Sequence, residues 1–317
     1  MNTVESPKLT PLFMRRMDGA LPAKLADILP SIQTCTNGVS NPRIISLGAG
    51  TGKVEGALAY ALPNAKVYAM DYQLQMIEEI GKQMLIPDGK HNLQAIRADI
   101  NNPPIARHSA DAVVASSVVH EILSFYDNYR LGKNTEQLFM NSALMLKTGG
   151  VFVLRDFVQP DLSEEQLLLT IGLAKQAGDA NPKEFLQRFI NTFKGMDVSD
   201  IQKQILKLEK EGKYTEGAQL YVSASDALEI VVHYSWARRF EDEVKERYAY
   251  LPLRSYQEYI RYCFKKAGVK TRVIKEYAYV QPEYPEYING RLDLYHVNTG
   301  KSYSIPPFTG VIALQRI

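Results

Sequence analysis

The chain reads RIISLGAGTG at residues 43–52. The apolar run at residues 43–47 predicts a buried strand, and the glycines that follow at alternating positions leave the backbone bare in a tight turn. Residues 53–62 then carry apolar side chains at the spacing of a helix face. A strand, a glycine turn and a helix in this order typically hold a nucleotide-like ligand beside the N-terminus of the helix.

The details of the turn argue against two common ligands of such sites. A phosphate-binding Walker A loop needs Ser or Thr after Gly-Lys, but here Val54 follows Gly52 and Lys53. The dinucleotide fingerprint needs a further glycine three places after its second glycine. That place holds Lys53 or Glu55, depending on which glycine starts the motif. The turn therefore favours a ligand without a pyrophosphate.

Two acidic residues follow the turn, each at the end of a predicted strand. Residues 65–70 predict the second strand, which ends at Asp71. About twenty residues after such a turn, a carboxylate can accept hydrogen bonds from ribose hydroxyls; Asp71 could also cap the next helix. Residues 93–98 predict the third strand, which ends at Asp99. Asp99 could bind a ligand or form a turn with the residues after it.

Four more strands are predicted at residues 111–116, 151–155, 271–274 and 310–314. The first of these is apolar almost throughout, which is typical of a parallel strand that is buried on both faces. Helical patterns lie between the strands, so the chain is predicted to be an α/β protein.

In their order and spacing these landmarks resemble the class I methyltransferases that use S-adenosylmethionine (SAM). The resemblance implies a Rossmann-like fold, with a seven-stranded, mostly parallel sheet and helices on both faces. It also implies that Asp71 binds the ribose, that Asp99 accepts a hydrogen bond from the adenine amino group, and that Ile100 stacks beside the adenine. The full set of cofactor-binding residues that it implies is Ser46, Gly48, Ala49, Gly50, Gly52, Asp71, Tyr72, Asp99, Ile100, Ser116 and Ser117.

One position departs from this family. Its members often carry an acidic residue two places before the first glycine, where it helps to hold the methionine amino group. This chain has Ser46 there. A serine can accept a hydrogen bond from that group through water, but it supplies no charge.

The resemblance places the transferable methyl group near the end of the fourth strand, which makes His120 the candidate general base. Glu121 is its neighbour in sequence, although adjacent residues on a helix point apart. Asp156 follows the fifth strand and could orient the substrate. His120 could instead be a buried residue bonded to a backbone carbonyl. The alternative function is a SAM-binding partner or sensor without catalysis.

We expect four segments. Residues 1–40 form an N-terminal helical cover, 41–158 the SAM-binding core, 159–252 a helical insertion, and 253–317 the rest of the core sheet. Patterns typical of capping boxes begin at Ser163 and Ser199 in the insertion. We expect the insertion to cover the carboxyl ends of the strands and to select the substrate. It could instead be an oligomerisation arm, so a homodimer is possible.

The composition limits the partners. Lys and Arg number 37 and Asp and Glu number 35, with no basic run, which favours a small-molecule acceptor over nucleic acid. Cys35 and Cys263 lie far apart, so neither a disulfide framework nor a metal site is expected. No apolar stretch reaches membrane-spanning length and the N-terminus lacks an apolar signal core, so we expect a cytoplasmic protein without membrane contact.

Overall fold

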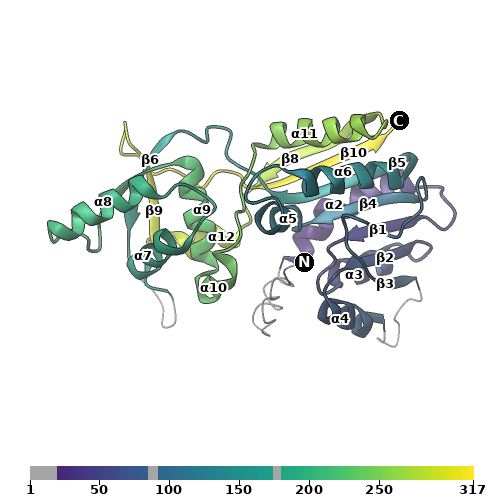
Figure 1. Cartoon of the computed structure of the whole chain (residues 1–317), viewed down its shortest axis with the longest axis horizontal. Coiled ribbons are helices and arrows are strands. Elements are labelled where there is room, and N and C mark those ends of the chain that lie inside the picture. The colour runs from purple at the N-terminus through teal and green to yellow at the C-terminus, as the bar shows by residue number, and fades with distance from the viewer. Residues whose placement is uncertain (1–19, 85–91, 174–179) are drawn as a thin grey trace.

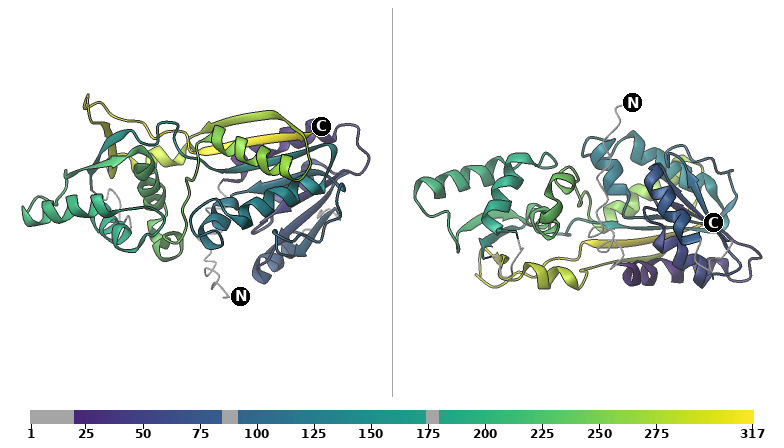
Figure 2. Two further views of the ribbon diagram at one scale, coloured as in Figure 1. Left: turned by 45° about the horizontal axis from the view of Figure 1, so that its top comes forward. Right: turned by 90° about the horizontal axis from the view of Figure 1, so that it is seen from below.

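The structure, a computed structural model, forms two lobes that lie side by side along the long axis of the molecule (Figures 1 and 2). It describes residues 20–84, 92–173 and 180–317. Residues 1–19 of the predicted N-terminal cover lie outside the described residues. We call residues 20–158, 253–279 and 309–317 the core lobe, and residues 159–252 and 280–308 the insertion lobe.

The core lobe is built on a seven-stranded sheet in the order β3-β2-β1-β4-β5-β10-β8. β10 runs antiparallel to β5 and β8 and the other strand pairs of this sheet are parallel, so the prediction of a mostly parallel sheet of seven strands is confirmed. The strands are β1 (Arg43–Leu47), β2 (Lys66–Asp71), β3 (Leu93–Arg97), β4 (Ala110–Ser116), β5 (Leu146–Phe157), β8 (Thr271–Tyr279) and β10 (Thr309–Arg316).

Helices cover both faces of this sheet, because successive side chains of its buried strands alternate between two apolar clusters. Ile44 packs in the cluster under the first set of helices, α2 (Leu21–Thr36), α3 (Lys53–Ala61) and α4 (Leu74–Met84). Ile45 and Leu47 pack in the cluster on the opposite face. The helices there are α5 (Val119–Phe125), α6 (Lys133–Met145) and α11 (Leu253–Lys266).

The insertion lobe contains the predicted helices and also a sheet that was not predicted from the sequence. It contains a three-stranded antiparallel sheet in the order β7-β6-β9, formed by β6 (Gln166–Ile171), β7 (Gln219–Ser223) and β9 (Leu292–His296). Leu167, Leu169 and Ile171 are fully buried, alternating with more exposed neighbours as a strand requires. Three consecutive leucines hid this alternation in the sequence.

Helices pack around the small sheet and share one hydrophobic core with it. They are α7 (Pro182–Thr192), α8 (Ser199–Lys210), α9 (Ala224–Ser235), η1 (Ala237–Arg239), α10 (Phe240–Glu243) and α12 (Glu283–Ile288). The capping box predicted at Ser163 is wrong, because Gln166 starts a strand. Ser199 does begin a helix, but Val198 is the cap residue and no side chain caps it.

The predicted boundary at residue 253 holds only in part. β8 and β10 complete the core sheet, as expected. Between them, however, α12 and β9 belong to the insertion lobe, where β9 pairs with β6. The insertion lobe is therefore made from two separate stretches of chain. Nowhere in the described residues is there a helix with both the length and the apolar character needed to cross a bilayer.

Candidate functional site

The glycine turn joins β1 to α3 with a backbone that other residues rarely adopt. Gly48, Gly50 and Gly52 have φ of +65°, +54° and +75°. A Cβ on Gly48 would lie 2.3 Å from Cγ2 of Val118, and one on Gly52 would lie 2.6 Å from Cγ1 of Ile80. Gly48 and Gly52 are thus needed because a larger residue would clash with Val118 or Ile80, whether or not a ligand is bound.

Asp71 lies against this turn from the end of β2. Its Oδ2 accepts a hydrogen bond from Gly50 N at 3.0 Å and its Oδ1 accepts one from Gln73 N at 3.0 Å. Ala49 N donates to Met70 O at 2.8 Å, which ties the turn to the same strand end. Burial raises the pKa of Asp71, and the two amides oppose that rise. Gln73 precedes α4, so its bond to Asp71 closes a turn before the helix and does not cap the helix itself. The ribose-binding role of Asp71 stays a prediction.

Tyr72 and Asp99 lie together with Tyr126 beyond the ends of β2 and β3. Burial raises the pKa of Tyr126 to about 12, with Tyr72 and then Asp99 adding to it. Asp99 is exposed, and its Oδ1 accepts a hydrogen bond from Asn101 N at 2.8 Å, which is the turn role that the sequence left open. Ile100 is half-buried against the core. The adenine-binding roles of Asp99 and Ile100 stay predictions.

The end of β4 carries two serines with unusual environments. The buried Oγ of Ser116 has no hydrogen-bond partner in the described part of the chain. Ser117 has a φ of +56°, and its N donates to Arg155 O at 2.8 Å. Positive φ is uncommon outside glycine and concentrates at functional sites.

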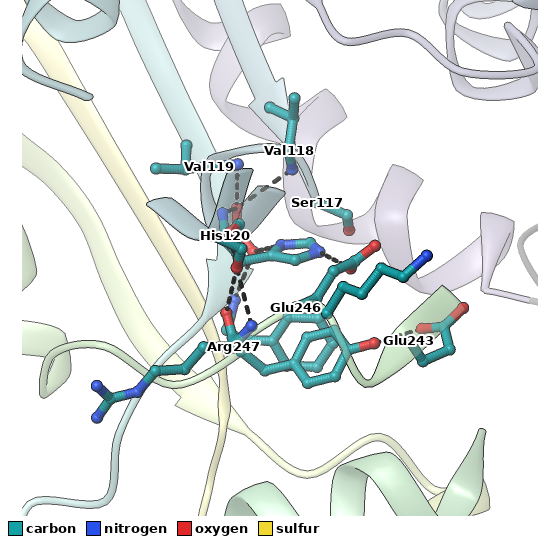
Figure 3. A network of polar contacts seen from close by, with 12 residues as sticks. Ser117, Val118, Val119, His120, Glu243, Glu246 and Arg247 are labelled. Carbon is teal, nitrogen blue, oxygen red and sulfur yellow. Dashed lines mark hydrogen bonds and ion pairs between the residues drawn. The ribbon is translucent and has the colours of Figure 1, made fainter. Parts of the chain in front are cut away.

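His120 lies between a carboxylate of each lobe (Figure 3). Its Nδ1 is 2.6 Å from Oδ1 of Asp156, and its Nε2 is 3.4 Å from Oε2 of Glu246. Burial alone would lower the pKa of His120, but these two carboxylates outweigh it and hold the pKa well above its usual range. The two carboxylates therefore favour the imidazolium form of His120.

Asp156 holds both His120 and the start of α5. Its Oδ2 accepts hydrogen bonds from Val119 N at 2.7 Å and Val118 N at 3.2 Å. Burial opposes ionisation, but His120 and the amides of Phe157 and Val119 keep the pKa of Asp156 below its usual value. Asp156 is thus an ionised group already engaged by several donors.

Arg155, the residue before Asp156, forms an ion pair with Asp27 of α2. The distance from Arg155 Nε to Asp27 Oδ2 is 2.8 Å, and both side chains are buried. Asp27 also accepts hydrogen bonds from the hydroxyls of Tyr277 and Tyr279 in β8. This network joins the N-terminal helix to the core sheet.

Glu121 and two glutamates of the insertion lobe, Glu243 and Glu246, are further acidic residues near His120. Burial, followed by Glu246, raises the pKa of Glu121 to about 8 and that of Glu243 to about 8. The Tyr248 hydroxyl donates to Glu243, and the Tyr248 ring centre lies 5.3 Å from that of His120. No local pattern in the sequence links Glu243, Glu246 and Tyr248 to His120, because they lie more than 100 residues beyond it.

The sequence reasoning also missed Glu55. Ser46 Oγ donates to Glu55 Oε1 at 2.6 Å, and the Glu55 residue is only 3% exposed. Its Oε2 has no hydrogen-bond partner among the described residues. Burial raises the pKa of Glu55 to about 6, which the bond from Ser46 and the charge of Lys24 partly oppose. An acidic residue three places after Gly52 was the available signal.

These residues fit SAM. The turn offers bare backbone, Asp71 is a carboxylate beside it, and Glu55 is a buried carboxylate with one oxygen unused. Residues 45–152 match the family model described as "Methyltransferase domain". This part of the chain is a methyltransferase domain. Its glycine turn and sheet order resemble those of the class I methyltransferases, which use SAM.

Among known proteins, the methyltransferase domain is 25% identical over 118 residues to the ubiquinone/menaquinone biosynthesis C-methyltransferase UbiE of Syntrophotalea carbinolica. The match covers 37% of this chain and 45% of that relative, so the chain spans less than half of the relative's length. Similar solved structures include the YcgJ protein of Bacillus subtilis, at 13% identity and a TM-score of 0.44, covering 91% of this chain and 98% of YcgJ. Another is the SAM-dependent methyltransferase SibL, at 13% identity and a TM-score of 0.46, covering 98% of this chain and 60% of SibL.

Proposed function

We propose that the chain transfers the methyl group of SAM to a small-molecule acceptor held between the core lobe and the insertion lobe. The observation that carries this proposal is the contact of Glu246 with His120 (Figure 3), together with that of the Tyr248 ring. His120 lies in the first turn of α5, the helix after β4, where the class presents the methyl group. An acceptor within reach of that group would therefore meet the insertion lobe. The near-neutral charge of the chain and the name of its quinone-biosynthesis relative support a small molecule.

Cofactor binding falls to the residues around the glycine turn. In our proposal the carboxylate of Asp71 accepts hydrogen bonds from the ribose, while Tyr72, Asp99 and Ile100 flank the adenine. When bound, SAM supplies an electrophilic methyl carbon on a sulfonium. The chain needs to hold an acceptor atom in line with that carbon and exclude water, which can supply several kcal/mol of the barrier reduction.

If the acceptor loses a proton, Glu121 is better suited than His120 to receive it. An imidazolium cannot accept another proton, and His120 is held in that form by Asp156 and Glu246. Glu121 has a pKa raised to about 8, so only a minor fraction of it is ionised near neutral pH, but that fraction is a stronger base than an ordinary carboxylate. His120 and Asp156 then act as positioning residues for α5. In this proposal Glu121, and not the sequence candidate His120, takes the role of the base.

Calorimetry with SAM tests cofactor binding, and an assay of methyl release over phenol, amine and enol acceptors tests turnover. We expect Asp71→Asn to weaken SAM binding by about 1–3 kcal/mol, since it loses a charge-assisted interaction with the ribose. NAD serves as the control ligand. Binding of NAD in place of SAM would refute the proposal, whereas SAM binding without turnover on any acceptor would favour the non-catalytic alternative.

A further inference from the structure

The position two places before the first glycine lacks the acidic residue that class I methyltransferases often have there. Ser46 occupies it, and its hydroxyl is directed to a carboxylate from another element, Glu55 in the first turn of α3. The Oγ to Oε1 distance is 2.6 Å. A carboxylate is therefore present beside this position, although the strand does not supply it.

Nothing in the described protein uses the second oxygen of this carboxylate. Glu55 Oε2 is buried and has no hydrogen-bond partner among the described residues. Lys24 favours the charged form of Glu55 through space, but it donates no hydrogen bond to Oε2. Leaving a buried carboxylate oxygen without a donor is costly, so such atoms usually indicate a missing partner. The partner that best suits it carries a positive charge and N–H donors.

We propose that Glu55, oriented by Ser46, binds the α-ammonium group of the amino-acid end of SAM, so that helix α3 supplies the charge that strand β1 lacks. This inference rests on the proposed function, since it concerns the same bound cofactor. It gives a role at the ammonium subsite to Glu55, which was not among the cofactor-binding residues expected from the sequence.

Two ligands isolate this subsite. S-adenosylhomocysteine has the amino-acid end, whereas 5′-methylthioadenosine has the same nucleoside and thioether without it. We expect Glu55→Gln to weaken S-adenosylhomocysteine binding about 10- to 100-fold in calorimetry, as loss of a charge-assisted hydrogen bond should. Its affinity for 5′-methylthioadenosine should stay within about twofold of the wild type. Asp71→Asn is the matched control, because it should weaken both ligands alike.

A rescue variant guards against a merely structural effect of Glu55→Gln. Adding Ser46→Asp to Glu55→Gln returns a carboxylate to strand β1, and it should restore most of the lost affinity for S-adenosylhomocysteine. Unchanged affinity in Glu55→Gln, or an equal loss for both ligands, would overturn the inference and leave the proposed function standing. Wild-type protein that binds neither ligand would instead remove the proposed function itself.

Discussion

Replacing Glu55 with Gln should make the protein without cofactor more stable above about pH 6, even though the same change should weaken cofactor binding. Burial raises the pKa of this carboxyl from 4.5 to about 6. The folded protein therefore binds this proton more tightly than the unfolded chain does. The resulting destabilisation is absent below about pH 4.5, grows as the pH rises towards 6 and is constant above that value.

The size of the effect follows from the same numbers. A rise in pKa from 4.5 to about 6 corresponds to about 2 kcal/mol at pH 8, since each pH unit is worth about 1.4 kcal/mol. At pH 5 only about 0.8 kcal/mol of this remains, because part of the carboxyl is protonated in both states. Glu55 is almost fully buried, so solvent screening should reduce these values little.

Urea unfolding of both proteins, followed by far-UV circular dichroism at about pH 5 and about pH 8, measures the difference. Fluorescence alone would be misleading, because the single tryptophan, Trp236, lies in the insertion lobe and reports on that lobe. The gain from Glu55→Gln should be larger at the higher pH. The same gain at both values, or a loss of stability at about pH 8, would refute the assignment of a buried, uncompensated charge.

Three further predictions concern other parts of the core lobe. In ¹⁵N NMR at about pH 7.5, both ring nitrogens of His120 should carry protons, and Glu246→Gln should lower its pKa; a neutral ring in the wild type would contradict the ion pair with Asp156. Arg155→Met should cost about 3–5 kcal/mol in urea unfolding because it strands the buried Asp27, and adding Asp27→Asn should recover part of that cost. No recovery would show that the pair is not the source of the loss. Gly48→Ala should cost about 1–3 kcal/mol, because φ is +65° and the new Cβ would meet Val118, and Val118→Ala should relieve some of it. An alanine variant with full stability would mean that the turn can shift.

The core sheet could be predicted because its signals are local. Between residues 43 and 116, each strand, turn and helix can be recognised from a few consecutive residues. Asp71 also lies at the distance from the glycines that is typical of such a fold. The insertion lobe could not be predicted in this way. In its sheet, β6 pairs with β9, and the two strands are separated by more than 100 residues of sequence. In addition, the consecutive leucines of β6 hide the alternation of buried and exposed side chains that would identify a strand.

In the candidate site, too, the residues near recognisable local patterns could be predicted, whereas the contacts between distant segments could not. The position of Asp71 beside the glycine turn could be predicted from the sequence. His120, Glu121 and Asp156 were candidate site residues, and in the structure they lie close together near the end of β4. The sequence could not give the charge of His120, because that depends on Glu246 from the other lobe. It also could not reveal Glu55 as the neighbour of Ser46, because the contact depends on how α3 packs on β1.

The insertion lobe takes its third strand, β9, from a segment that returns to it after β8 has been laid down in the core sheet. A nascent chain therefore cannot finish this lobe until it has been synthesised through residue 296. Excising residues 159–252 would not yield a minimal catalytic core either, because it would leave β9 without β6 as its partner. Any exchange of specificity between related proteins would have to transplant both stretches as a unit.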